Sequence, residues 1–138
     1  MRIILDTNIL LSALLSSSGA PAKLLEAWER GRFTLVACDE LLAEVREVAN
    51  RAFFRARLRA SAAELLLAGI QDFSLFVQDI PPAPRGPDPK DTFLLALADA
   101  SEAGFLVTGD KRLLSLEHYK STRLISPSAM VVILRGVT

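Results

Sequence analysis

The chain has 138 residues, 51% of them hydrophobic and 23% charged, and its sixteen basic residues balance its sixteen acidic ones. This composition excludes a disordered chain, and zero net charge argues against a protein that coats nucleic acid by bulk attraction. A single cysteine and a single histidine exclude a disulfide within the chain and a zinc site built from several such residues.

The first half of the chain alternates short apolar runs with helical patterns. Uniformly apolar runs are typical of buried strands, and we predict strands at residues 2–5 and 33–37. Helices are expected at residues 9–15, at residues 21–30 with Pro21 in the first turn and Gly31 after the end, and at residues 39–49 with Asp39 as the cap.

The second half continues the alternation around a proline-rich stretch, residues 81–89, which forbids both a helix and a central strand. Helices are predicted at residues 51–59, 62–73 and 88–102 and from Pro127 onward, and strands at residues 74–78, 105–108 and 123–125. Strands that alternate with helices predict an α/β fold with a parallel sheet, and the length predicts one domain, residues 1–138. No apolar run reaches the roughly 18–20 residues of a membrane span, so we expect a cytoplasmic protein without membrane contact.

Four acidic residues fall where a parallel sheet places its ligand sites. Asp6 and Asp110 follow the first and fourth strands, Asp91 lies in the first turn of a helix, and Glu44 borders the apolar stripe of another. Ligands bind beyond the carboxyl ends of such strands. Each acid also has a structural interpretation: Asp6 and Asp110 as helix caps, Asp91 as a charge favoured by the helix dipole, and Glu44 as a solvated charge.

Clustered carboxylates repel one another unless a cation neutralises them, and oxygen ligands suit Mg²⁺ or Mn²⁺. Such a cation lowers the pKa of a bound water and offsets charge on phosphate oxygens. Neither a nucleotide-binding glycine motif nor a Ser-His-Asp order is present. We therefore expect a substrate that brings its own phosphate, and a hydrolytic reaction.

Four segments in order resemble the motifs of the PIN-domain proteins, in particular toxin components of toxin–antitoxin systems similar to the VapC toxins. The segments are residues 6–15 (DTNILLSALL), 41–48 (LLAEVREV), 88–98 (DPKDTFLLALA) and 106–110 (LVTGD). Any one of these motifs alone is weak evidence for the resemblance, but all four in order, over nearly the whole chain, are strong evidence.

The resemblance implies a three-layer α/β/α sandwich with a central parallel sheet of four to five strands. It also implies a Mg²⁺- or Mn²⁺-dependent endoribonuclease that leaves 5′-phosphate and 3′-hydroxyl ends, with an antitoxin protein as partner. The implied metal and catalytic residues are Asp6, Glu44, Asp91 and Asp110, supported by Asn8 and Thr108. The alternatives are a PIN-like module that binds RNA or protein without cutting and, ranked last, a phosphatase of small phosphoesters.

Basic residues near these acids offer contacts to RNA. Lys90, Lys111 and Arg112 adjoin the proposed site, and plain surface charge is the other interpretation. The basic stretch 51–59 is expected either to bind RNA or an acidic partner, or to be a solvated helix face with Phe53 and Phe54 in the core. Asp88 precedes a proline and is expected to cap a helix. Trp28 is expected in the core or on a dimer face, and a homodimer is expected.

Overall fold

A six-stranded sheet forms the centre of the protein in the computed structural model, which describes residues 1–80 and 92–136. The strands are β1 (Arg2–Leu5), β2 (Thr34–Ala37), β3 (Leu75–Phe76), β4 (Phe105–Val107), β5 (His118–Tyr119) and β6 (Thr122–Ile125). They lie in the order β3-β2-β1-β4-β6-β5, and every pairing is parallel except that of β5 with β6. The predicted α/β sandwich around a parallel sheet is therefore confirmed.

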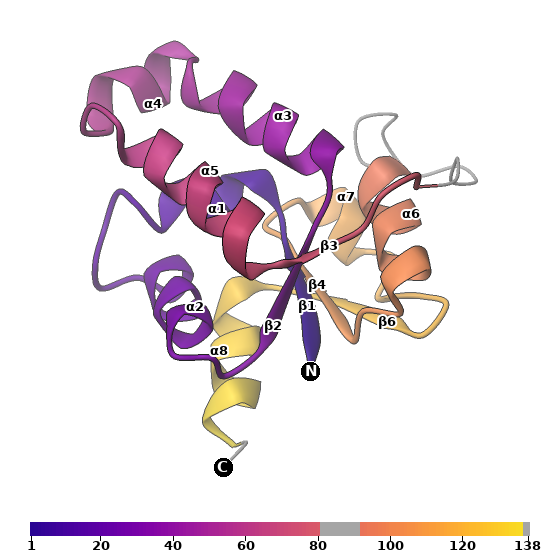
Figure 1. Ribbon diagram of the computed structural model, residues 1–138. Helices are drawn as coiled ribbons and strands as arrows, with labels where there is room; N and C mark the ends of the chain where they lie inside the picture. The colour runs from indigo at the N-terminus through magenta and orange to yellow at the C-terminus, as the bar shows by residue number, and fades with distance from the viewer. Residues whose placement is uncertain (81–91, 137–138) are drawn as a thin grey trace.

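Eight helices in the described residues surround the sheet: α1 (Thr7–Ser12), α2 (Ala20–Glu29), α3 (Asp39–Ala49), α4 (Ala52–Arg57), α5 (Ala62–Phe73), α6 (Thr92–Ser101), α7 (Lys111–Leu114) and α8 (Pro127–Arg135). Figure 1 shows α2 and α8 side by side on one side of the sheet and α6 on the other. The helices α3, α4 and α5 form the long connection between β2 and β3.

The order in which strands are added to the sheet changes direction between β1 and β4, the two central strands, which are parallel. From β1 the chain moves outward to β2 and β3, and it then returns to β4 on the opposite flank of β1. Leu5 and Val107 are paired across these two strands. The residues that follow them, Asp6 and Thr108, therefore emerge together at the carboxyl edge, where open α/β sheets bind their ligands.

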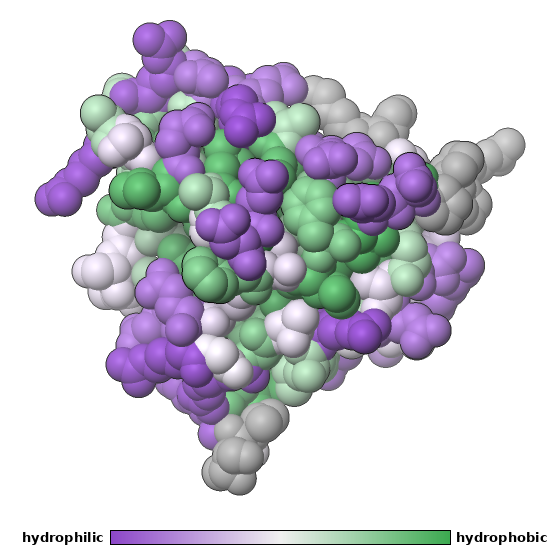
Figure 2. All heavy atoms as spheres, in the orientation of Figure 1, coloured by the Kyte–Doolittle hydropathy of each residue, from purple (hydrophilic) through white to green (hydrophobic). Residues whose placement is uncertain are grey.

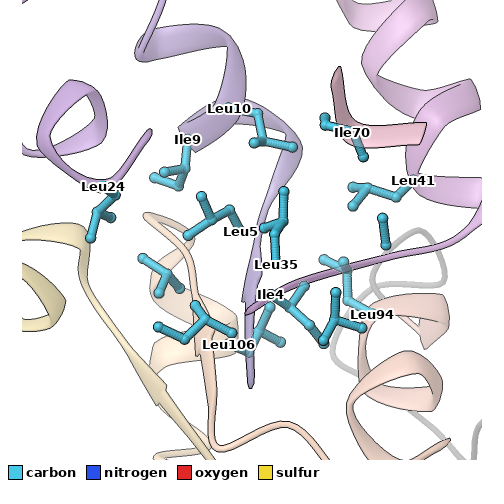
Figure 3. Close-up of a cluster of buried hydrophobic side chains, with 14 of the residues drawn as sticks. Ile4, Leu5, Ile9, Leu10, Leu24, Leu35, Leu41, Ile70, Leu94 and Leu106 are labelled. Atoms are coloured by element: carbon cyan, nitrogen blue, oxygen red, sulfur yellow. The ribbon is translucent and has the colours of Figure 1, made fainter. Parts of the chain in front are cut away.

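The core fills both sides of the sheet with aliphatic side chains. Ile3, Ile4 and Leu5 of β1 have at most 1% of their surface exposed, so this strand is covered on both faces. Figure 3 shows side chains from β1, α1, α3 and α6 converging on this centre, Leu10 and Leu94 among them. This packing fixes the position of β1, and with it the position of Asp6.

Several local predictions differ from the structure in instructive ways. Asp39 was expected to cap α3, but this was wrong: it is the first helical residue, and the extended Cys38 occupies the cap position without a side-chain bond. The predicted strand at 74–78 is limited to Leu75–Phe76. The antiparallel strand β5 was not predicted, because two residues are too few to show periodicity. The predicted start of α6 and the proline-rich stretch 81–89 lie outside the described residues.

The surface combines charged regions with exposed apolar side chains. In Figure 2, hydrophobic residues extend across the middle of the face, over α5 and β3, between hydrophilic ones. On α5, Leu65 and Phe73 are largely exposed and border a groove shared with α2, and half-buried Trp28 lines the same groove. Within the described part of the chain, no helix is both long enough and apolar enough to cross a membrane.

Candidate active site

Asp6 stands at the centre of the site because it links the end of β1 to the start of α1. It is the N-cap of α1, and its Oδ1 accepts a hydrogen bond of 2.7 Å from the backbone N–H of Thr7. Its own backbone N–H donates to the carbonyl of Val107 on β4, at 3.0 Å. Only 9% of Asp6 is exposed. The capping interpretation is thus correct for Asp6, but it leaves a nearly buried carboxylate at the edge of the sheet.

Thr108 ties Asp6 to Asp110. This fully buried residue donates its hydroxyl proton to Oδ2 of Asp6 over 2.7 Å, and its Oγ1 accepts from the backbone N–H of Asp110 over 3.0 Å. Asp110 in turn caps α7, because its Oδ1 accepts from the N–H of Arg112 at 2.8 Å. One hydroxyl therefore fixes the relative position of two acidic residues that belong to neighbouring strand ends.

Glu44 reaches the same site from the middle of α3. Its Oε1 accepts a hydrogen bond from the hydroxyl of Thr7, which is itself buried. Because α1 packs against α3, the side chains of these two helices meet although they are 37 positions apart in the chain. Thr7 thus links Glu44 to Asp6, its neighbour in the chain.

The electrostatics of the site are those of crowded carboxylates. Burial raises the pKa of Asp6 above its ordinary value; hydrogen bonds from Thr108 and Thr7 oppose this shift, and the charge of Asp110 adds to it. Burial also raises the pKa of Glu44, the Thr7 hydroxyl opposes the shift, and the charge of Asp6 adds to it. The folded protein therefore holds negative charge at a place where it is costly, as functional sites often do.

An open cleft of about 890 Å³ brings these groups together. Side chains from the β1–α1 junction, from α3, from α6 and from the β4–α7 turn line it: Asp6, Thr7, Asn8, Ile9, Ser12, Glu40, Ala43, Glu44, Glu47, Val48, Arg51, Phe93, Gly109 and Asp110. Of the predicted site residues, Asp6, Asn8, Glu44 and Asp110 thus share one cleft, and Thr108 lies beneath it. A cleft of this size accommodates a nucleotide-sized ligand.

The donor set fits a hard divalent cation. The candidate ligands are carboxylate oxygens, which Mg²⁺ and Mn²⁺ prefer. Within residues 1–80 and 92–136, no three acidic, histidine or cysteine side chains are grouped closely enough to bind one metal ion. Mg²⁺ usually takes one or two carboxylates and keeps several waters, so a Mg²⁺ site does not require three such side chains to meet at one point. Asp110 and Glu44 lie close enough to Asp6 for their negative charges to interact with it, and a cation would relieve this repulsion.

The remaining predicted residues divide into two groups. Asp91, Lys90 and Asp88 lie outside the described residues. Lys111 and Arg112 are exposed on α7 next to Asp110, and neither of them lines the cleft.

The cleft also contains residues that the sequence analysis did not select. Thr7 was passed over although it stands between Asp6 and Asn8, because its contact with Glu44 depends on the packing of α1 against α3. Ser12 faces the cleft one helical turn beyond Asn8. Its spacing of four residues from Asn8 would have identified it if the helix had been predicted to begin before Asn8, as α1 does.

Comparison with known proteins identifies the fold and the family. The family model described as PIN domain matches residues 2–112. No curated protein matches the chain. Among solved structures, the chain is similar to one in the crystal structure of VapBC2 from Rickettsia felis bound to a DNA fragment from their promoter, with a TM-score of 0.58 and 17% identity over 91% of this chain and 98% of that chain. This likeness establishes the similarity of the fold.

Proposed function

The chain belongs to the PIN domain family, and we propose that it is a metal-dependent endoribonuclease, the toxin of a type II toxin–antitoxin pair. The observation that carries the proposal is that three carboxylates from distant parts of the chain, Asp6, Glu44 and Asp110, line one cleft at the carboxyl edge of the sheet. Simple helix capping accounts for the backbone bonds of Asp6 and Asp110. It does not account for the approach of Glu44 to Asp6, which costs stability without a cation.

In this proposal Asp6, Glu44 and Asp110 hold Mg²⁺ or Mn²⁺, directly or through water, and Asp91 joins them. When bound, the cation lowers the pKa of a water and offsets negative charge on the phosphate. Thr108 keeps the carboxylate of Asp6 in place with its hydroxyl. Thr7 does the same for Glu44, and Asn8 supplies a polar side chain on the wall of the cleft.

The substrate is RNA, and the products carry 5′-phosphate and 3′-hydroxyl ends. The cleft is open and lined by acids, so it suits a substrate that approaches with a metal-neutralised phosphate. Lys90, Lys111 and Arg112 are proposed to contact the RNA beyond the cleft.

A protein antitoxin is the proposed partner. The similar fold belongs to a chain of VapBC2, which was crystallised on a fragment of promoter DNA. We further propose a homodimer that works in the cytoplasm. Co-purification with the product of a small neighbouring open reading frame tests the partner, and the elution volume of the purified chain tests the dimer.

Cleavage of mixed RNA by the purified protein tests the enzymatic proposal. The wild type is expected to cut RNA with Mn²⁺ and not with EDTA. Asp6→Asn is expected to abolish cleavage while the protein stays folded, since Asn caps helices about as well as Asp. Asp72→Asn, which removes an exposed carboxylate on α5, is the matched control and should cut at the wild-type rate.

Either of two outcomes contradicts the proposal. An Asp6→Asn variant that cuts as the wild type does shows that the activity comes from elsewhere. A wild type that binds RNA but never cuts it, with Mn²⁺ or Mg²⁺, favours the non-catalytic binding module.

A further inference from the structure

The four arginines of the basic stretch 51–59 lie in different surroundings. Arg51 precedes α4 and lines the carboxylate cleft. Arg57 lies over the ring of Phe53, with its guanidinium carbon 3.9 Å from the ring centre. Arg55 and Arg59 line a separate, smaller hollow beside α3 and α5. The stretch is therefore not one basic face, and only its first arginine is directed toward the site.

Arg51 brings a positive charge into an acidic environment. Among the described residues that line the cleft, five are acidic and Arg51 is the one base. Its guanidinium lies 3.2 Å from Oε1 of Glu47, one helical turn away. Both side chains are more than half exposed, at 54% and 71%, so this ion pair contributes little to stability. The pair can open at little cost, and the arginine is available to another anion.

Apolar and aromatic side chains also line this cleft. Val48 lies near the end of α3, and Phe93 lies at the start of α6. Both line the cleft, and Phe93 is partly buried against the core. Aromatic rings that line a nucleic-acid-binding cleft are the usual platform on which an unpaired base stacks. The cleft thus offers a cation for a phosphate and a ring for a base, next to the carboxylates.

We propose that Arg51 and Phe93 form a nucleotide-binding subsite of the cleft, in which Arg51 binds a backbone phosphate of single-stranded RNA and Phe93 stacks on a base. Arginine suits this role because its planar guanidinium binds phosphate through two parallel hydrogen bonds. The subsite rests on the proposed ribonuclease function and adds to it the residues that hold the substrate strand beside the carboxylates.

Binding of a short fluorescein-labelled oligoribonucleotide, followed by fluorescence anisotropy, tests the subsite. Measurements are made in the Asp6→Asn background with EDTA, so that the RNA stays intact and no metal contributes. Arg51→Gln is compared with Arg55→Gln, which removes an exposed arginine one turn further along the same segment. Affinity is recorded between about 50 and 200 mM salt, because each phosphate contact to a single strand adds about 0.7 to the slope of log K against log salt.

Arg51→Gln is expected to weaken binding and to lower the salt slope by about 0.7, while Arg55→Gln leaves both unchanged. Arg51→Lys should keep the salt slope, because the positive charge remains. It should lose part of the affinity, because lysine cannot make the two parallel hydrogen bonds to phosphate. Phe93→Leu should weaken binding about tenfold without changing the slope. Circular dichroism of each variant verifies that it is folded.

An unchanged salt slope in Arg51→Gln overturns the proposal, and so does an equal loss in Arg51→Gln and Arg55→Gln. If Arg51→Gln loses an acidic protein partner but binds RNA normally, the subsite is a protein contact and the proposal is wrong. Failure of the subsite can be distinguished from failure of the proposed ribonuclease function. Failure of wild-type protein to cut RNA refutes the ribonuclease, whereas wild-type cleavage with an unaltered Arg51→Gln slope refutes only the subsite.

Discussion

Replacement of Thr108 by valine removes one hydroxyl with almost no change of shape. That hydroxyl donates to the nearly buried carboxylate of Asp6 and accepts from the backbone of Asp110. A hydrogen bond to a charged group is worth about 1.5–3 kcal/mol, and loss of the neutral bond adds about 1 kcal/mol. We therefore expect Thr108→Val to lower the free energy of unfolding at neutral pH by about 2.5–4 kcal/mol in the absence of metal.

The loss should depend on pH in a defined direction. The Thr108 bond holds down the pKa of Asp6, which burial raises. Valine lets the pKa of folded Asp6 rise further, and a carboxyl with a raised pKa in the folded state destabilises the protein when it is ionised. The difference from wild type is therefore greatest above the pKa of folded Asp6. It shrinks as the pH falls toward the ordinary aspartate range of about 4 and Asp6 takes up a proton.

Urea unfolding at a series of pH values, followed by far-ultraviolet circular dichroism in EDTA, measures this dependence. Thr108→Ser is the control: it keeps the hydroxyl and removes one buried methyl, which costs about 1 kcal/mol at every pH. If valine and serine cost the same at neutral pH, or if the cost of valine does not change with pH, the Thr108 hydroxyl does not support Asp6 and the reasoning fails.

Three further outcomes are expected. Mn²⁺ at about one hundred times its Kd should stabilise the wild type by about 2.7 kcal/mol but stabilise Asp6→Asn and Asp110→Asn much less; equal thermal shifts in all three would contradict a carboxylate metal site. Cys38 is buried and its thiol pKa is raised to about 11, so it should react with a thiol reagent at pH 8 only after unfolding, and rapid labelling of the native protein would refute its burial. Gly31 has φ +72° with open space around it, so Gly31→Ala should cost about 1 kcal/mol in urea unfolding through backbone strain alone, and an unchanged midpoint would contradict this.

The sequence was sufficient to predict the central strands β1, β2, β4 and β6 and the positions of two acids relative to them. Asp6 and Asp110 directly follow apolar runs, or follow them after a short turn, and the ends of parallel strands share an edge. Their meeting, however, requires β4 to lie beside β1, and the order of strands is a property of the whole sheet. The resemblance to the PIN-domain motifs implied that these acids share a site, but the order of the strands came only from the structure.

Contacts between helices could not be predicted from the sequence. Glu44 lies at the margin of an apolar stripe, where periodicity alone cannot separate a solvated charge from a site residue. Its bond to Thr7 follows from the packing of α1 on α3. The same limit applies to Arg51 and Arg55, which look equivalent in one basic stretch. They are separated because α3 ends at Ala49 and a new helix begins at Ala52.

The bond between Asp6 and Thr108 joins residues 102 positions apart in the chain, and this separation has a consequence for protein synthesis. Ribosomes add about 5–20 residues per second, so Asp6 emerges about 5–20 s before the strand that completes its surroundings. During that interval β1 has no β4 beside it, and the carboxylates of Asp6 and Asp110 cannot yet share a cleft. A nascent chain is therefore without its acidic site until β4 has left the ribosome and docked against β1. The ribosome that makes this protein is therefore not exposed to an assembled acidic site for most of translation.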